Sequence, residues 1–159
     1  MAKLIYGMGQ VSLDGYVAGP DGNFDWVTPG EDLHHHAGVE LVTTGTAIYG
    51  RKMYDLLVFW ETADKLPDMP PAGVEFSLSW QSLDKIVVSE TLGEPTSKRT
   101  RVVPRLSLEG MHKLKADATK PISIAGPTTA SPFLNAGLVD KVTGYFIPYV
   151  SGGGLPLFK

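Results

Sequence analysis

The sequence predicts an α/β fold with a largely parallel sheet, and three observations support that prediction. Short apolar runs at 85–89 and 121–125 have the pattern of strands that are buried on both faces. Segments with helical spacing alternate with such runs along the chain, as they do in strand–helix–strand units. The length of 159 residues suits one domain, so residues 1–159 are expected to form a single domain.

The first half of the chain is predicted to contain two strands and two helices around one long loop. Residues 3–12 form the first predicted strand, and its two glycines suggest close packing against a neighbouring segment. Residues 13–30 are dense in Gly, Pro, Asp and Asn, which favours a lid or binding loop. The other predicted elements are a helix over 31–41, a strand over 42–49 that ends at Gly50, and a helix over 52–59.

The second half is predicted to contain four strands and two helices. Three prolines favour irregular structure over 61–82. Ser107 suits the N-cap of a helix with apolar residues on one face, and Gly137 suits the left-handed end of a helix over 128–136. The predicted strands cover 85–89, 100–104, 121–125 and 140–150, and a turn is expected at 151–154.

The composition argues against several classes of protein. The chain has no cysteine, which excludes disulfide bonds, iron–sulfur clusters and thiol catalysis. The net charge is -3, so there is no basic excess and nucleic acid is not expected as a partner. No apolar run approaches the length of a membrane span, and the N-terminus has no apolar signal core. A cytoplasmic protein that binds a small molecule is therefore expected, with no membrane partner.

Two strand-to-helix turns are candidate phosphate sites. The first is Gly50-Arg51-Lys52, where a glycine permits close approach of a ligand and two cations suit a phosphate. The second is Gly126-Pro127-Thr128-Thr129, where hydroxyl residues begin a helix after a buried strand. The alternative for each is an ordinary turn whose polar side chains are solvated.

Ser89 follows a third strand, and this repetition suggests a dinucleotide ligand. Ligands of open α/β sheets bind beyond the carboxyl ends of the strands, which is where all three segments are expected to lie. The glycine-rich fingerprint Gly-x-Gly-x-x-Gly is absent, so a Rossmann domain of the usual type is not supported.

The loop after the first strand is a candidate cover for a flat ligand. Asp14 and Asp25 flank this segment, and Trp26 offers an aromatic wall. The alternative is a surface loop in which the aspartates only form turns.

Three further patterns are weaker as chemical signals. His34-His35-His36 is a poor metal site because consecutive helical residues point about 100° apart, so we expect no metal and only His34 at a pocket. Asp21 begins a calcium-like loop, but Trp26 stands where that loop requires glycine. No Gly-x-Ser-x-Gly segment is present, so serine hydrolysis has no support.

The order of these motifs resembles the dihydrofolate-reductase-like superfamily. The motifs are Ser-Leu-Asp-Gly-Tyr-Val-Ala at 12–18, Asp-Trp at 25–26, Gly-Arg-Lys-Met-Tyr at 50–54, Val-Ser-Glu-Thr-Leu at 88–92, Ile-Ser-Ile-Ala-Gly at 122–126 and Gly-Gly-Gly-Leu-Pro-Leu-Phe at 152–158. The sequence is most similar to the reductase domain of the bifunctional riboflavin-biosynthesis deaminase-reductases and its stand-alone relatives. This resemblance implies a three-layer α/β/α domain with a mixed, largely parallel sheet that binds NADPH.

The resemblance also implies roles for individual residues. Cofactor phosphates would contact Gly50, Arg51 and Lys52, the adenosine side would lie near Ser89, and the pyrophosphate would lie at Gly126, Thr128 and Thr129. The loop from Leu13 to Ala18 would border the nicotinamide and the substrate, with Ala18 on the cofactor side. Asp25 and Trp26 would lie beside the substrate, and Asp14 or Asp25 would orient it or relay a proton if burial raises its pKa.

The expected activity is NADPH-dependent hydride transfer to a small heterocyclic or carbonyl substrate, such as 5-amino-6-(5-phosphoribosylamino)uracil. Related proteins commonly have a second glycine where this chain has Pro127, which lacks an amide donor. A domain that binds a nucleotide without catalysis is therefore one alternative. Dihydrofolate reductase activity is another, although Glu31 and Asp32 match its helical carboxylate poorly.

The resemblance further suggests a homodimer. Relatives continue past the 152–158 motif with one more strand, so two alternatives are open: the final strand of the sheet is missing, or a tail carries it beyond residue 159. An unpaired edge strand favours association with another chain, which a second subunit would satisfy.

Overall fold

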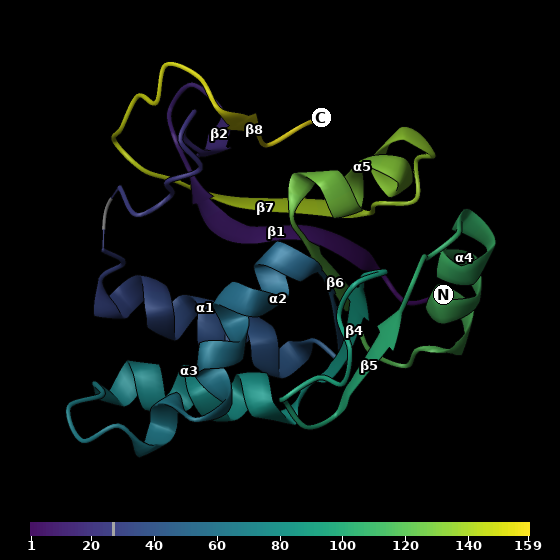
Figure 1. The fold of residues 1–159 in the computed structure, drawn as a ribbon, viewed down its shortest axis with the longest axis horizontal. Coiled ribbons are helices and arrows are strands. Elements are labelled where there is room, and N and C mark those ends of the chain that lie inside the picture. The colour runs from purple at the N-terminus through teal and green to yellow at the C-terminus, as the bar shows by residue number, and fades with distance from the viewer. Residues whose placement is uncertain (27) are drawn as a thin grey trace.

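The computed structural model describes residues 1–26 and 28–159, and its centre is a six-stranded sheet (Figure 1). The strands lie in the order β5-β4-β3-β6-β1-β7, and all neighbours are parallel. The strands are β1 (Leu4–Val11), β3 (Thr46–Gly50), β4 (Asp84–Val88), β5 (Thr100–Val103), β6 (Ile122–Ala125) and β7 (Lys141–Phe146). Val27, which falls in the predicted loop 13–30, lies outside the described residues.

Helices cover both faces of the sheet, so the domain has the three layers that the sequence predicted (Figure 1). The helices α1 and α3 pack together on one face with α2, whereas α4 and α5 lie on the other. Their bounds are α1 Glu31–Thr43, α2 Arg51–Leu57, α3 Pro71–Ser82, α4 Leu108–Asp117 and α5 Pro127–Asn135, with 3-10 turns at Val58–Glu61 and Ala63–Lys65. None of these described helices is both long and apolar enough to span a membrane.

Alternation along the strands divides the buried side chains between two cores. Ile48 joins the core beneath α4 and α5, whereas its neighbours Ala47 and Tyr49 join the core beneath α1 and α3. The second core also contains Trp80, whose indole nitrogen donates to the Tyr49 hydroxyl at 3.2 Å. Both faces of the central strands are therefore buried, as their continuous apolar runs predicted.

The prediction of irregular structure over 61–82 holds up to residue 70, where 3-10 and other turns occur, but was wrong beyond it, because α3 occupies Pro71–Ser82. Pro71 is the first residue of this helix, where the fixed φ of proline suits the backbone and its missing amide has no helical partner to lose. The fully buried Trp80 then anchors the helix against the sheet. The prolines that suggested a break therefore begin a helix.

Smaller corrections concern element ends and one glycine. The helix α1 continues to Thr43, so β3 begins at Thr46 rather than at residue 42. A Cβ on Gly7 would collide with the Thr143 carbonyl, as close packing predicted, whereas a Cβ on Gly9 would meet nothing within 4 Å. Phe146 ends β7 four residues early, since Pro148 has no amide to extend the ladder.

A second, antiparallel sheet was not predicted. It joins β2 (Tyr16–Ala18) to β8 (Leu155–Pro156), beyond the arrowhead of β1 in Figure 1. The strand β2 lies inside the segment that the sequence predicted to be loop. This small sheet ties the segment after β1 to the segment after β7.

Candidate functional site

The carboxyl ends of the parallel strands place the predicted cofactor residues at one edge of the sheet. Ser89 follows β4, Gly50 ends β3 and Gly126 follows β6, and these three strands are adjacent. The chain leaves β3 toward β4 but leaves β6 toward β7, on the opposite side. Adjacent strands whose connections diverge form a topological switch point, the usual ligand site of an open α/β sheet.

Two helices begin side by side at this switch point. Gly50 is the N-cap of α2 and Gly126 is the N-cap of α5, and neither helix start has a side-chain cap. A Cβ on Gly50 would lie 2.5 Å from the Thr129 hydroxyl, so the absence of a side chain lets the two turns approach each other. Gly126 has a φ of 93°, a conformation that strongly favours glycine. Uncapped amides at helix starts favour an anion.

Pro127 removes less from this arrangement than the sequence suggested. It is the first residue of α5, so it replaces only one of the unpaired amides at the start of the helix. Thr128 and Thr129 occupy the next two positions, where no side chain of the N-cap competes for their amides. The turn therefore keeps two donors suited to an anion.

The cationic residues of the first turn lie at the start of α2. The Arg51 Nε donates to both carboxylate oxygens of Asp55, at 2.9 and 2.8 Å, and the Arg51 side chain is 43% exposed. Lys52 is exposed beside it. The Asp55 pair uses Nε, and the guanidinium carries four further N–H groups that suit a phosphate.

The loop after β4 is fixed by Ser89 and by a residue that sequence reasoning missed. The Ser89 hydroxyl oxygen accepts from the amides of Thr91 and Leu92, at 3.2 and 3.1 Å. The buried Tyr54 hydroxyl accepts from the amides of Thr96 and Ser97, at 3.1 and 3.2 Å. Tyr54 lies in the Gly-Arg-Lys-Met-Tyr motif, so its place in that motif was the available signal.

At the end of β1, Asp14 accepts three hydrogen bonds that we call the Asp14 clamp. Oδ1 accepts from the Ser12 hydroxyl at 2.7 Å and from the Ser151 amide at 3.0 Å, and Oδ2 accepts from the Gly152 amide at 2.8 Å. The Ser12 hydroxyl, followed by the Ser151 amide, lowers the pKa of Asp14 to about 2. The raised pKa required for proton relay is absent, which corrects that expectation for Asp14.

The substrate side of the predicted site contains a stacked aromatic pair. Trp26 lies 5.0 Å from Tyr149 between ring centroids, with 20° between the ring planes. Both rings line a hollow of about 340 Å³ together with Gly19, Pro20, Asp21, Asn23 and Ser151. Tyr149 was missed because the sequence placed it inside a strand. Its only signal was an aromatic residue next to Pro148.

Three other predicted site residues flank this hollow. Asp25 is exposed, and its amide donates to the Asn23 side-chain oxygen at 2.9 Å. Leu13 is 61% exposed, and its amide donates to the Tyr149 carbonyl at 2.8 Å. Ala18 is partly buried in β2, where it pairs with Leu155.

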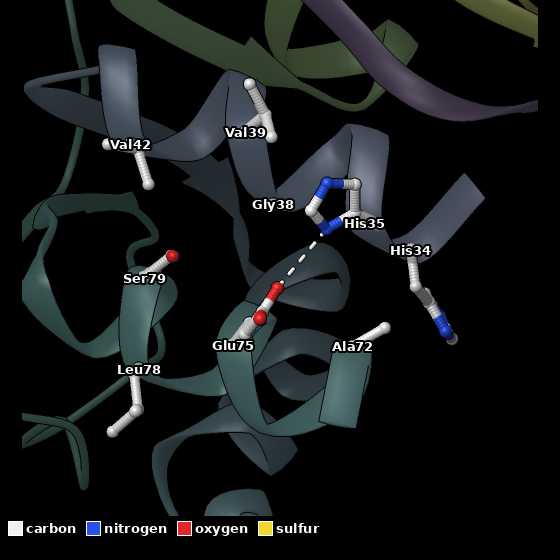
Figure 2. A pocket seen from close by; sticks show the side chains of 9 residues that line it. All are labelled: His34, His35, Gly38, Val39, Val42, Ala72, Glu75, Leu78 and Ser79. Atoms are coloured by element: carbon white, nitrogen blue, oxygen red, sulfur yellow. Dashed lines mark hydrogen bonds and ion pairs between the residues drawn. The ribbon is translucent and has the colours of Figure 1, made fainter. Parts of the chain in front are cut away.

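His34 lines a different hollow, between α1 and α3 (Figure 2). Figure 2 shows the His35 ring directed at Glu75, 3.2 Å away, whereas the His34 ring points elsewhere. The His34 ring meets Trp60 at 5.8 Å, and the His36 ring meets Tyr145 at 5.9 Å, so the three imidazoles diverge. No cluster of three or more metal-ligating His, Cys, Asp or Glu side chains occurs among the described residues.

A comparison with protein families now identifies the chain's relatives. The model of the RibD C-terminal domain matches residues 3–159. The chain belongs to the RibD C-terminal domain family. The resemblance inferred from the sequence motifs is thereby confirmed.

Two curated relatives differ in how much of their length the chain covers. The uncharacterized protein YyaP of Bacillus subtilis is 31% identical over 149 residues, which are 93% of this chain and 76% of YyaP. The riboflavin biosynthesis protein RibD of Mycobacterium tuberculosis is 28% identical over 154 residues, which are 89% of this chain but only 41% of that protein.

Solved structures of RibD-type proteins have the same fold. A putative riboflavin biosynthesis protein from Shewanella sp. PV-4 superposes with a TM-score of 0.67 at 26% identity, covering 100% of this chain and 84% of that one. The deaminase/5-amino-6-(5-phosphoribosylamino)uracil reductase of Thermotoga maritima superposes with a TM-score of 0.64 at 17% identity. That match covers 99% of this chain and 48% of the Thermotoga chain, and it supports the fold alone.

Proposed function

We propose that this RibD C-terminal domain is an NADPH-dependent reductase of the riboflavin-biosynthesis type. The observation that carries the proposal is the convergence of two uncapped helix starts, at Gly50 and Gly126, on the switch point of the sheet. Family membership supports the same assignment. The Thermotoga relative is named as a reductase of 5-amino-6-(5-phosphoribosylamino)uracil, so this compound is the first substrate to test.

The described residues fit NADPH. The close approach of Gly50 to Thr129 brings both sets of free amides together, which suits a ligand with several phosphates. Arg51 and Lys52 then add positive charge at the start of α2, on the side of the switch point next to Ser89. A 2′-phosphate would find its charged partners there.

In the proposed mechanism, this chain orients the two reactants and excludes water between them. NADPH supplies the hydride when it is bound. Thr128 and Thr129 would hold the pyrophosphate through their amides, and Arg51 would select the phosphorylated ribose. Trp26 and Tyr149 give the substrate an aromatic wall on the side of β1 and β7. Asp25 remains the candidate for orienting the substrate or relaying its proton.

Titration with NADPH and NADH tests the proposal, using Arg51→Gln and a matched control. Charge-assisted hydrogen bonds contribute about 1.5–3 kcal/mol, so Arg51→Gln should weaken NADPH binding roughly 10- to 100-fold and leave NADH binding nearly unchanged. The control is Arg99→Gln, since Arg99 pairs with Asp84 at 2.9 Å just before β5, at the opposite edge of the sheet. Isothermal titration calorimetry supplies the dissociation constants.

Oxidation of NADPH, followed by the loss of its absorbance, tests turnover with 5-amino-6-(5-phosphoribosylamino)uracil. Failure to bind NADPH at millimolar concentration would refute the reductase. Binding of NADPH without turnover of any candidate substrate would instead favour the alternative of a non-catalytic nucleotide-binding domain. Turnover of dihydrofolate would favour the remaining alternative, although Glu31 and Asp32 both lie exposed in the first turn of α1.

A further inference from the structure

The segment that follows β7 crosses over the loop that follows β1, and backbone bonds fasten the two together. The Leu13 amide donates to the Tyr149 carbonyl, and the Leu157 amide donates to the Gly15 carbonyl, both at 2.8 Å. Beside the second of these bonds, β8 pairs with β2. Residues 147–154 therefore lie directly against the loop that the family resemblance assigns to the nicotinamide and substrate.

The Asp14 clamp is the side-chain part of this junction. Asp14 reaches the amides of Ser151 and Gly152, which are 137 and 138 positions away in the sequence. Ser12 orients the carboxylate, since its fully buried hydroxyl donates to Oδ1 and accepts from the Tyr16 amide at 2.9 Å. All three hydrogen bonds of the Asp14 clamp come from Ser12, Ser151 and Gly152, so these contacts join the loop after β1 to residues 151–152.

The loop that Asp14 holds carries Tyr149, two residues before Ser151. Tyr149 stacks on Trp26, and both rings line the hollow at this end of the sheet. Trp26 belongs to the segment after β2, and Tyr149 belongs to residues 147–154. The stacking of the two rings therefore depends on how these two segments are positioned relative to each other. The backbone around Tyr149 is restrained by the bonds from the Leu13 amide to the Tyr149 carbonyl and from the Tyr149 amide to the Ile147 carbonyl. Asp14 adds side-chain bonds to the amides of Ser151 and Gly152.

We propose that Asp14 is a positioning residue that holds Tyr149 against Trp26, and that Tyr149 forms one wall of the substrate site. This inference rests on the proposed function, because it assumes that a flat substrate is reduced at this end of the sheet edge. Asp14 acts through the loop, whereas Tyr149 contacts the substrate.

A double-mutant cycle tests the coupling, with 5-amino-6-(5-phosphoribosylamino)uracil as the probe. Asp14→Asn and Tyr149→Leu should each raise KM for the probe about 10-fold, the loss expected for a charge-assisted hydrogen bond or an aromatic contact, with little change in kcat or in the Kd of NADPH. The double variant should resemble Tyr149→Leu alone, because Asp14 has nothing left to position. Tyr149→Phe, which keeps the ring, should restore KM. Multiplicative effects in the double variant would overturn the positioning role.

Quenching of tryptophan fluorescence by acrylamide provides a readout that needs no activity. Asp14→Asn should increase the quenching of Trp26, and the increase should vanish in a Trp26→Phe background. Asp84→Asn is the matched control, since it removes an exposed carboxylate at the opposite edge. Ser12→Ala removes the Ser12 bond of the clamp and should give a smaller increase in the quenching of Trp26. This variant replaces Asp14→Asn in the test if Asp14→Asn fails to fold.

The two readouts separate failure of this inference from failure of the proposed function. If the wild-type protein binds no NADPH, the reductase assignment fails, while the quenching still decides whether Asp14 holds Tyr149 on Trp26. If acrylamide quenches Trp26 equally in the wild type, in Asp14→Asn and in Ser12→Ala, the inference is overturned even in an active reductase.

Discussion

The two ends of the candidate site are built in different ways. At the turn end, around Gly50, Ser89 and Gly126, the hydrogen bonds of Arg51 and Ser89 join residues two to four positions apart. Tyr54 reaches further there, to amides 42 and 43 positions away. At the loop end, Asp14 bonds to residues 137 and 138 positions away. The turn end is thus specified largely by local features, namely a strand, a glycine and a helix start. The loop end exists only after distant segments have met.

The difference suggests that the loop end should be easier to disrupt, and Gly154 is its most sensitive position. A Cβ at Gly154 would collide with the Ala18 carbonyl, and its φ of 121° is unfavourable for other residues. Gly154→Ala should lower the free energy of unfolding by about 3 kcal/mol, since strain and overpacking each contribute about 1–3 kcal/mol. Urea denaturation measures this change.

Gly153→Ala is the control for that prediction. A Cβ there would meet only Pro20, at an ordinary distance of 3.6 Å. Its effect should stay below about 0.5 kcal/mol, the range of surface substitutions. Equal effects at the two glycines would remove the argument that β2 and β8 meet too closely for a side chain.

Tyr54→Phe tests the most distant contact at the turn end. Removal of the hydroxyl leaves the amides of Thr96 and Ser97 without their acceptor, which should cost about 1–3 kcal/mol of unfolding free energy. The loop after β4 should loosen, so hydrogen exchange should accelerate at residues 91–99 but not at 147–154. Ser82→Ala, which removes an exposed hydroxyl bond to Ser79, is the control. Faster hydrogen exchange at both 91–99 and 147–154 would contradict the expectation that the turn end and the loop end are stabilised independently.

The smallest effect is a dependence on pH at the loop end. The pKa of Asp14 lies at about 2, below its ordinary value of 3.8, because the clamp favours the carboxylate. The clamp is therefore complete above pH 3.8 and is lost as the pH falls through about 2. Quenching of Trp26 should stay constant from pH 7 to pH 4 and rise below that range. A rise centred near pH 6 would assign the change to another group.

The sequence predicted most of the fold because its strands carry their own signals. Apolar runs identified β4 and β6, and Ser107 marked the start of α4, where its hydroxyl accepts from the Gly110 amide at 3.0 Å. The failures came from residues with two structural uses. Pro71 suits a break and also the first position of a helix, and only the burial of Trp80 decides between them.

The candidate site was predictable at the turn end and much less so at the loop end. Gly50 and Gly126 were found because a glycine between a strand and a helix is a local pattern. The distant partners of Asp14 are backbone amides, which have no sequence signature, so the residue was assigned to chemistry rather than to holding Ser151 and Gly152. Asp14 was identified from the sequence as a site residue, but its role depends on contacts with residues 137 and 138 positions away.

The position of β1 between β6 and β7 has a consequence for how the protein is made. Ribosomes release the N-terminal segment first, yet β1 lies between β6 and β7, and the Tyr6 hydroxyl donates to the Leu157 carbonyl, 151 positions away, at 2.6 Å. β1 therefore emerges before β6, β7 and Leu157, and its apolar faces stay uncovered until those segments follow. Long-range pairing of this kind slows folding and leaves nascent chains open to misassociation, so we expect yields in cells to depend on translation rate and chaperone supply.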